Sequence, residues 1–239
     1  LLRLVAKHNR VDIEVEPLRD VTYLHGFIER CDGDTASEHY AAFFTPDESP
    51  ESERDAFAAA IAYLVSKADA TLWYYSKYER TIYRKLQARY PEVCSLKLIE
   101  TIFDPERSID LYNDVVVKAT EWPTNDQSIK TLAKYLGFAW RDSNPSGAAS
   151  IEWFDQWVKT RDPSIRQRIL DYNEDDCRAT RVLLDGVKAM MAAAETWLRE
   201  RGLPKIQLMV RADNEAALGF YEALGLEPQN VVTLGRFLT

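Results

Sequence analysis

The chain has 239 residues, of which 46% are hydrophobic and 28% are charged, and its formal net charge is −8. These values are typical of one large globular domain, or of one domain with a smaller piece attached, with a substantial buried core. They argue against a plain nucleic-acid-binding module, because contacts to phosphates need local positive charge. An enzyme whose acidic residues are covered by metal ions is compatible with them.

Cysteine and histidine usage argues against disulfide bonds and against a zinc site. The cysteines are scattered without a CxxC pair, which favours reduced thiols in a cytoplasmic protein. The histidines lack the spacing of a zinc site. No apolar run is long enough to span a bilayer. The residues concerned are Cys31, Cys94, Cys177, His8, His25 and His39.

The N-terminal part of the chain predicts three successive strands. Residues 10–16 alternate polar and apolar side chains, and residues 21–29 and 38–44 are rich in β-forming residues. The segment between the second and third strands, RCDGDTAS, has turn chemistry. We expect an antiparallel meander.

The following segments predict helices with one more short strand. The strand covers residues 71–76, while residues 96–106 and 110–120 fit neither pattern clearly. Strands that come first, with helices interleaved and following, favour an α/β fold with a mixed sheet. We expect residues 1–187 to form one domain and residues 188–239 a separate segment. Helical periodicity covers residues 55–68, 78–90, 128–138, 150–160 and 164–201.

Two acids on the first predicted strand suggest a metal site. Asp12 and Glu14 are two residues apart, so their side chains point to the same face of the sheet. Neighbouring carboxylates repel each other, and a divalent cation between them is one sufficient reason for the pattern. The alternative is an edge strand whose polar face meets water.

Two later stretches contain acids in suggestive positions. In YYSKYERT, Glu79 lies at a strand-to-helix junction, where the alternative role is to complement the helix dipole. In YNEDDCRAT, Tyr172 and Asp176 are four residues apart and share one helix face, while Glu174 and Asp175 point elsewhere as solvated neighbours. We expect Asp176 to reach a metal and Tyr172 to orient a water. The alternative is a solvated face with a stacked tyrosine.

Together these residues match a known requirement of phosphodiester hydrolysis. Hydrolysis by two metal ions needs about four converging carboxylates and a group that positions the attacking water. Carboxylate and water ligands suit Mg²⁺ or Mn²⁺. The set is supplied, in chain order, by Asp12, Glu14, Glu79 and Asp176, with Tyr172 beside the water.

The order and spacing of these motifs resemble the DEDDy group of 3′–5′ exonucleases, which have an RNase H-like fold. The first motif, DxE, matches Asp12 to Glu14, and the third, YxxxD, matches Tyr172 to Asp176. The sister group has HxxxxD, but the residue at that position is Asp171. More narrowly, DIEVEPLRDVTYLHGFIE, YYSKYERTIYRKL, SIKTLAKYLGFAWR and YNEDDCRAT are similar to the predicted RNase H-like nuclease domain. The resemblance covers about residues 9–187.

The resemblance implies a fold and an activity. The fold is a mixed sheet of three antiparallel strands followed by parallel strands, flanked by helices. The activity is 3′–5′ hydrolysis of terminal phosphodiester bonds of DNA or RNA with two Mg²⁺ or Mn²⁺ ions, and the implied partners are a single-stranded end and a helicase or second nuclease module. In one departure from the family, the second motif has Glu79 in place of Asp, and Asp110 is a reserve ligand.

Basic residues follow the second motif. Lys77, Arg80 and Arg84 stand among tyrosines and are candidate contacts to a nucleic-acid strand. The alternative is a solvated helix of mixed charge. Trp153 and Trp157 lie about one helical turn apart, and we expect them to pack in the core.

The C-terminal segment resembles the C-terminal half of a GNAT-type N-acetyltransferase. We expect a helix, a strand at residues 206–210, a helix that begins at Asn214 and is capped by Gly225, and a last strand. The resemblance places Asn214 and Tyr221 beside acetyl-CoA. However, the glycine-rich cradle for the pyrophosphate is missing. A small sheet here would leave an exposed edge that favours dimerisation or docking on residues 1–187.

Two other functions remain open at this point. A catalytically degenerate nuclease fold could serve as a binding or assembly module. The presence of Glu79 in place of Asp keeps that hypothesis open, while the acids retained at the other positions weaken it. An acetyltransferase-derived protein could use the nuclease-like part as a scaffold, but the missing phosphate loop disfavours it.

The missing cradle makes a prediction about coenzyme binding. We expect no binding of acetyl-CoA to this chain in isothermal titration calorimetry, because no glycine-rich loop presents N–H groups to its phosphates. Micromolar binding would contradict this interpretation of residues 188–239.

Overall fold

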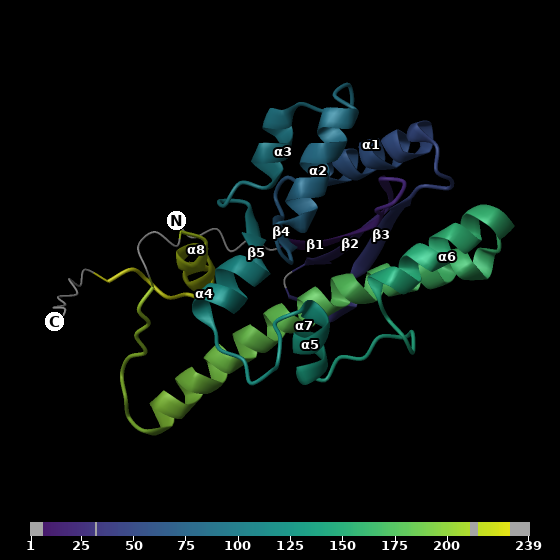
Figure 1. Cartoon of the computed structure of the whole chain (residues 1–239). Coiled ribbons are helices and arrows are strands. Elements are labelled where there is room, and N and C mark those ends of the chain that lie inside the picture. Colours follow the sequence, from purple (N-terminus) through teal and green to yellow (C-terminus); the bar gives the residue numbers. More distant parts are fainter. Residues whose placement is uncertain (1–6, 32, 211–214, 230–239) are drawn as a thin grey trace, which may run out of the picture.

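The protein is built on a five-stranded mixed sheet with helices on both faces (Figure 1). The computed structural model describes residues 7–31, 33–210 and 215–229. The strand order is β3-β2-β1-β4-β5; β1, β2 and β3 pair antiparallel, whereas β4 pairs parallel to both β1 and β5. This confirms the predicted fold class. The strands are β1 (Lys7–Glu16), β2 (Val21–Cys31), β3 (His39–Phe44), β4 (Thr71–Tyr74) and β5 (Ser108–Asp110).

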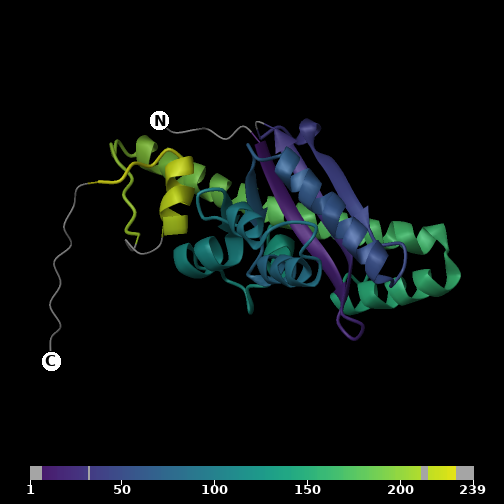
Figure 2. The same cartoon turned by 90° about the horizontal axis from the view of Figure 1, so that it is seen from above.

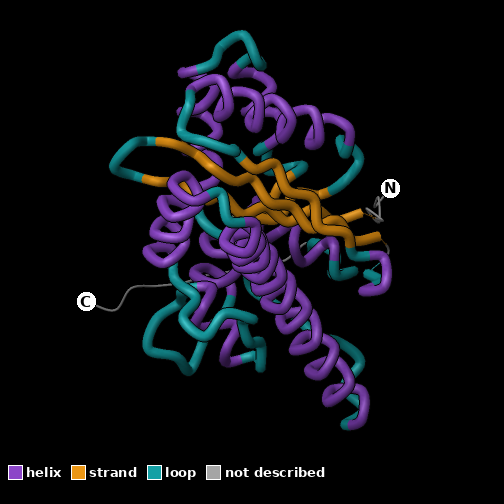
Figure 3. The backbone as a smooth tube through the Cα atoms, turned by 90° about the vertical axis from the view of Figure 1, so that its right-hand side faces the viewer, coloured by secondary structure: helices purple, strands orange, loops and turns teal. Residues whose placement is uncertain are grey.

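Two groups of helices cover the two faces of the sheet (Figure 3). One face carries α1 (Pro50–Ser66), α2 (Tyr78–Arg89) and α3 (Leu96–Ile102). The other carries α5 (Ile129–Tyr135), α6 (Gly147–Thr160) and the long α7 (Pro163–Glu200). A short helix, η1 (Thr35–Ser37), precedes β3. Beside β5 lie η2 (Leu111–Val116), α4 (Val117–Ala119) and α8 (Glu215–Ala223), the last at the end of the molecule nearest the C-terminus (Figure 2).

Residues 96–106 and 110–120, which fit neither pattern clearly, contain short elements that begin at side-chain caps. Ser95 accepts a hydrogen bond from the backbone N–H of Leu98 at the start of α3. Asp110 ends β5 and accepts one from the N–H of Asn113, which starts the π-helical turn η2. Elements of three to seven residues are too short to show a helical or strand period, which explains why the sequence pattern was ambiguous.

β1 is the central strand of the sheet, between β2 and β4. Val11 and Ile13 point into the core beneath α1 and α2, where they pack with Phe27 and Phe57. The intervening side chains therefore face α7 on the other side of the sheet, because neighbours alternate along a strand. The edge-strand alternative for the acids of β1 is wrong.

A second core fills the space between the sheet and α6 and α7. Tyr23 and Phe154 stack with ring centroids 4.2 Å apart, and Trp153 packs edge-on against Tyr172. The predicted core position of Trp153 is confirmed, since it is buried. Trp157 is only partly buried; it packs against the same cluster and donates to the carbonyl of Pro46.

The C-terminal segment matches its prediction only in part. Residues 206–210 form no strand, because no neighbouring strand pairs with them among the described residues, and a single strand has no partners for its backbone groups. Gly225 has φ +87° after α8, as expected for a helix end. The predicted helix start at Asn214 and the last strand lie outside the described residues.

The C-terminal elements pack onto the nuclease-like core. Helix α7 runs without a break through the predicted domain boundary at residue 187. Phe220 of α8 is buried against Trp73 of β4, with ring centroids 6.4 Å apart, and the Tyr221 hydroxyl donates to the carbonyl of Ala119. Within the described part of the chain, no helix combines the length and the apolar character needed to cross a membrane.

Helix α7 packs closely against a glycine of β2. A Cβ atom on Gly26 would overlap the amide oxygen of Asn173 and lie 2.8 Å from its Cγ and 3.1 Å from Cε2 of Tyr40. The missing side chain therefore makes room for a fully buried asparagine between the helix and the strand.

We expect Gly26→Ala to destabilise the protein by about 1–3 kcal/mol, because the new methyl group pushes Asn173 out of a filled space. Chemical denaturation measures this loss. Gly147→Ala is the control, since a Cβ there meets no atom within 4 Å and lies in the first turn of α6. Equal stability of the two variants would contradict the predicted close packing.

Candidate metal centre

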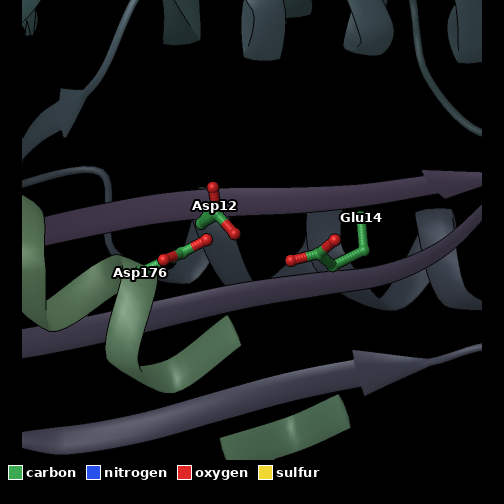
Figure 4. A group of neighbouring side chains, drawn as sticks. All are labelled: Asp12, Glu14 and Asp176. Atoms are coloured by element: carbon green, nitrogen blue, oxygen red, sulfur yellow. The ribbon is translucent and has the colours of Figure 1, made fainter. Parts of the chain in front are cut away.

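Three acidic side chains converge between β1 and α7. Each of Asp12, Glu14 and Asp176 offers a carboxylate oxygen, and these oxygens lie within 4.8 Å of one another. Figure 4 shows the carboxylates of Asp12 and Asp176 pointing toward each other, with Glu14 further along the same face of β1. The prediction that both acids of β1 face the same side is confirmed, and the close approach of α7 brings in Asp176.

Neighbouring side chains fix the two acids of β1. The Asn173 amide donates to Asp12 Oδ2 at 2.8 Å. The Tyr23 hydroxyl lies 3.3 Å from Glu14 Oε2 and 2.8 Å from Ser150 Oγ. Tyr23 is the extra residue of a β-bulge, because Glu14 pairs with Leu24 but the next residue of β1 pairs with residue 22. The bulge turns the Tyr23 side chain toward Glu14.

Two side chains donate to the Asp176 carboxylate. The Trp140 indole donates to Oδ1 at 2.6 Å, and Lys130 Nζ lies 3.3 Å from Oδ2. The same ammonium donates to the Tyr172 hydroxyl at 2.7 Å. Tyr172 and Asp176 thus share one face of α7, and both are buried, which excludes the alternative of a solvated helix face.

Burial and nearby negative charge favour protonation of the two acids of β1. Burial, and then the charges of Glu14 and Asp176, raise the pKa of Asp12 well above its usual range. Burial, and then the charge of Asp176, raise the pKa of Glu14 to about 7. Burial and the charges of Glu14 and Asp176 also raise the pKa of the Tyr172 hydroxyl far above its ordinary value. Tyr172 is therefore a neutral hydrogen-bond donor at physiological pH.

The other two predicted ligands lie outside this group of three. Glu79 is buried at the start of α2, and its Oε2 has no hydrogen-bond partner among the described residues. Burial raises the pKa of Glu79, and its charge contributes to the raised pKa of Asp12, so the two carboxylates are neighbours. Asp110 accepts hydrogen bonds from the N–H groups of Ser76 and Asn113 and closes the turn after β5.

The remaining acids of the run at residues 171–176 pair with arginine. Asp175 is buried and accepts from the backbone N–H and Nε of Arg141 at 2.8 and 2.9 Å. Glu174 accepts from Arg141 and Arg178, each at 2.8 Å. The expectation that Glu174 and Asp175 are solvated neighbours is wrong, because Arg141 folds back from the loop after α5 and holds both.

The basic residues of α2 are mostly engaged. Arg80 and Arg84 both form ion pairs with Glu100 of α3, so phosphate would have to displace that carboxylate. Lys77 is exposed at the start of the helix. Next to it, Tyr78 is 47% exposed, and burial followed by the charges of Glu14 and Asp12 raises its pKa to about 12. Tyr78 is thus a half-exposed side chain whose pKa responds to the charges of the β1 acids.

Sequence reasoning did not identify the residues that hold the cluster in place. Lys130 and Trp140 both lie in SIKTLAKYLGFAWR, and Asn173 lies inside YNEDDCRAT. Residues 128–138 show a helical period, but neither that period nor the family resemblance indicates that Lys130 and Trp140 contact a residue about 40 positions away. The presence of buried donors beside acids became visible only in three dimensions.

Comparison with known proteins identifies two regions. Residues 187–226 match the Acetyltransferase (GNAT) family. An acetyltransferase of Pectobacterium atrosepticum is 48% identical over 50 residues, which are 21% of this chain and 36% of that protein. An acetyltransferase of Yersinia enterocolitica is 44% identical over 50 residues, with the same shares of the two chains. The chain thus spans about a third of the length of these curated relatives.

The larger match covers the region that contains the acid cluster. No solved structure matches the chain significantly. The RNase_H superfamily matches residues 11–187, which include residues 11–16 of β1, α7 up to Val187 and every residue of the carboxylate cluster. This match extends over more than half of the chain and agrees with the mixed sheet and the flanking helices. The chain therefore belongs to the RNase H superfamily.

Proposed function

We propose that this protein is a metal-dependent 3′–5′ exonuclease that hydrolyses terminal phosphodiester bonds of DNA or RNA. The observation that carries the proposal is the convergence of Asp12, Glu14 and Asp176, with the Tyr172 hydroxyl beside them. The spacing of these residues matches the DEDDy pattern, and the superfamily match supports a nuclease fold.

The donor set fits a divalent metal ion. Burial and the charge of Asp176 raise the pKa of both Asp12 and Glu14, which is an arrangement that a divalent cation relieves. Oxygen ligands suit Mg²⁺ or Mn²⁺. We assign Asp12, Glu14 and Asp176 as ligands, and Glu79 as a further ligand of a two-ion site, since its free carboxylate oxygen is close enough to influence Asp12.

The protein residues position the reacting groups. Bound divalent ions supply the positive charge that activates water and offsets charge developing on the phosphate. Asn173 and Trp140 hold the carboxylates of Asp12 and Asp176 in fixed orientations by single hydrogen bonds. Tyr172 stays neutral, so its hydroxyl can hold the attacking water in line with the bond that breaks.

One exposed aromatic side chain suggests how a strand end is held. Tyr78 is half exposed and directly precedes Glu79 at the start of α2, and base–aromatic stacking tolerates any sequence. Lys77 beside it is free to contact a phosphate, whereas Arg80 and Arg84 are bound to Glu100. We therefore assign the first nucleotide contacts to Lys77 and Tyr78.

We expect Asp12→Asn and Asp176→Asn each to lower the hydrolysis rate roughly 100-fold or more, because each removes a charged ligand from the cluster. End-labelled single-stranded DNA and RNA with Mg²⁺ or Mn²⁺ provide the assay. Glu174→Gln is the matched control, since Glu174 lies two residues from Asp176 but pairs with Arg141 and Arg178. Wild-type rates in both aspartate variants would exclude this active site. An inactive wild type would favour a binding or assembly module.

We expect the stability of the metal-free protein to fall as the pH rises from about 5 to about 8, because the folded state holds protons on Asp12 and Glu14 that the unfolded chain has released. Urea denaturation in EDTA across this range measures the slope. Saturating Mn²⁺ should flatten it, and Glu14→Gln should reduce it. A slope that is the same in wild type and Glu14→Gln would show that Glu14 does not titrate in this range.

A further inference from the structure

Lys130 is the cation of the candidate metal centre. It extends from α5 toward α7, and its Nζ lies 2.7 Å from the Tyr172 hydroxyl and 3.3 Å from Asp176 Oδ2. The ammonium also lies 4.9 Å from the ring centroid of Tyr172 and 5.9 Å from that of Trp140. The side chain is 29% exposed, so the charge is partly withdrawn from water between two aromatic rings and a carboxylate.

The charge of Lys130 acts on the whole cluster. Burial raises the pKa of Asp12 and of Glu14, and the Lys130 ammonium opposes that rise in both. Among the residues that the structure describes, no other cation forms an ion pair with Asp12, Glu14 or Asp176. One ammonium thus pairs with Asp176 and favours the charged forms of Asp12 and Glu14.

The hydrogen bond to Tyr172 determines the direction of the phenol. An ammonium has three donors and no acceptor, so the Tyr172 oxygen must accept from Lys130. The hydroxyl proton of Tyr172 then points away from Lys130. That proton is left for an acceptor other than Lys130, and the carboxylate of Asp176 or a water held by the cluster can serve as this acceptor.

We propose that Lys130 is the built-in counter-cation of this site and the positioning residue of Tyr172. Before divalent ions bind, its ammonium balances the carboxylates, and the ions must bind against its repulsion. Once they are bound, it keeps the Tyr172 hydroxyl directed at the water position. The part that concerns Tyr172 rests on the proposed exonuclease function; the part that concerns metal affinity does not.

The two roles predict changes of opposite sign in one variant. We expect Lys130→Met in the full chain to bind Mn²⁺ roughly tenfold more tightly or better, because a charge close to the ligands no longer repels the ion. The metal-free variant should unfold a few degrees lower, since the buried carboxylate of Asp176 loses its ion pair. Calorimetric titration with Mn²⁺ and thermal denaturation in EDTA measure the two effects. A purely structural lysine would lower stability without raising affinity.

Lys134 provides the matched control. It lies one turn further along α5, is exposed, and places its Nζ 6.0 Å from the Trp140 ring centroid, with no contact to the acids. Lys134→Met should leave both Mn²⁺ affinity and metal-free stability at wild-type values. If Lys130→Met does not fold, Lys130→Gln tests the same affinity change, because it removes the charge but keeps N–H donors for Tyr172.

Kinetics at saturating Mn²⁺ separate positioning from packing. We expect Lys130→Met and Tyr172→Phe each to lower kcat roughly tenfold with little change in KM, and the double variant to be no slower than Tyr172→Phe alone. Lys130→Gln should retain more of kcat than Lys130→Met. Independent, multiplying losses would overturn the positioning role.

The outcomes distinguish this inference from the proposed function. If the wild type binds Mn²⁺ and Lys130→Met binds it no more tightly, the inference is wrong and the exonuclease proposal stands. Tighter binding in Lys130→Met with an inactive wild type overturns the exonuclease proposal and supports Lys130 as counter-cation. Absence of Mn²⁺ binding in both proteins overturns both.

Discussion

The candidate site depends on the close packing of α7 against the first two strands. Gly26 has no side chain, so the buried Asn173 fits against β2 and donates to Asp12 on β1. The same contact sets the height and rotation of α7, and Asp176 lies less than one turn further along the helix. A carboxylate from the end of the domain therefore meets two from its beginning because a single glycine lets a helix approach the sheet.

The acidic run of α7 shows how one helix can direct neighbouring charges to different tasks. Asp175 and Glu174 bind Arg141, and Arg178 adds a second partner for Glu174. Asp176 turns the other way, toward β1, where its partners are Trp140 and Lys130. Repulsion along the run is thus relieved by arginine on one face of α7 and by a lysine and an indole on the other. The arginine pairs also anchor the loop that carries Trp140 to the helix that carries Asp176.

Helix α8 of the acetyltransferase-like segment packs against the core of the nuclease-like domain. Phe220 is fully enclosed with Trp73, and α7 continues across the point where the two family matches meet. In contrast, residues 206–210 remain irregular and include the exposed Met209, because the described residues contain no strand that pairs with them. Helix α8 needs only an apolar surface, which η2 and β4 provide, whereas a strand needs backbone partners.

The sequence by itself determined the fold class, most of the long helices and strands, and the identity of the converging carboxylates, because period, spacing and motif order are local properties of the chain. It also indicated Tyr172 and Asp176 correctly as a pair on one helix face. Tertiary structure alone decided that β1 is central, that Glu79 and Asp110 lie outside the group of three, and that Arg80 and Arg84 are occupied by Glu100. It also decided that Lys130 reaches Tyr172 and Asp176. The reason is physical: partner choice among charged side chains depends on distances between segments far apart in the chain, and periodicity carries no information about those distances.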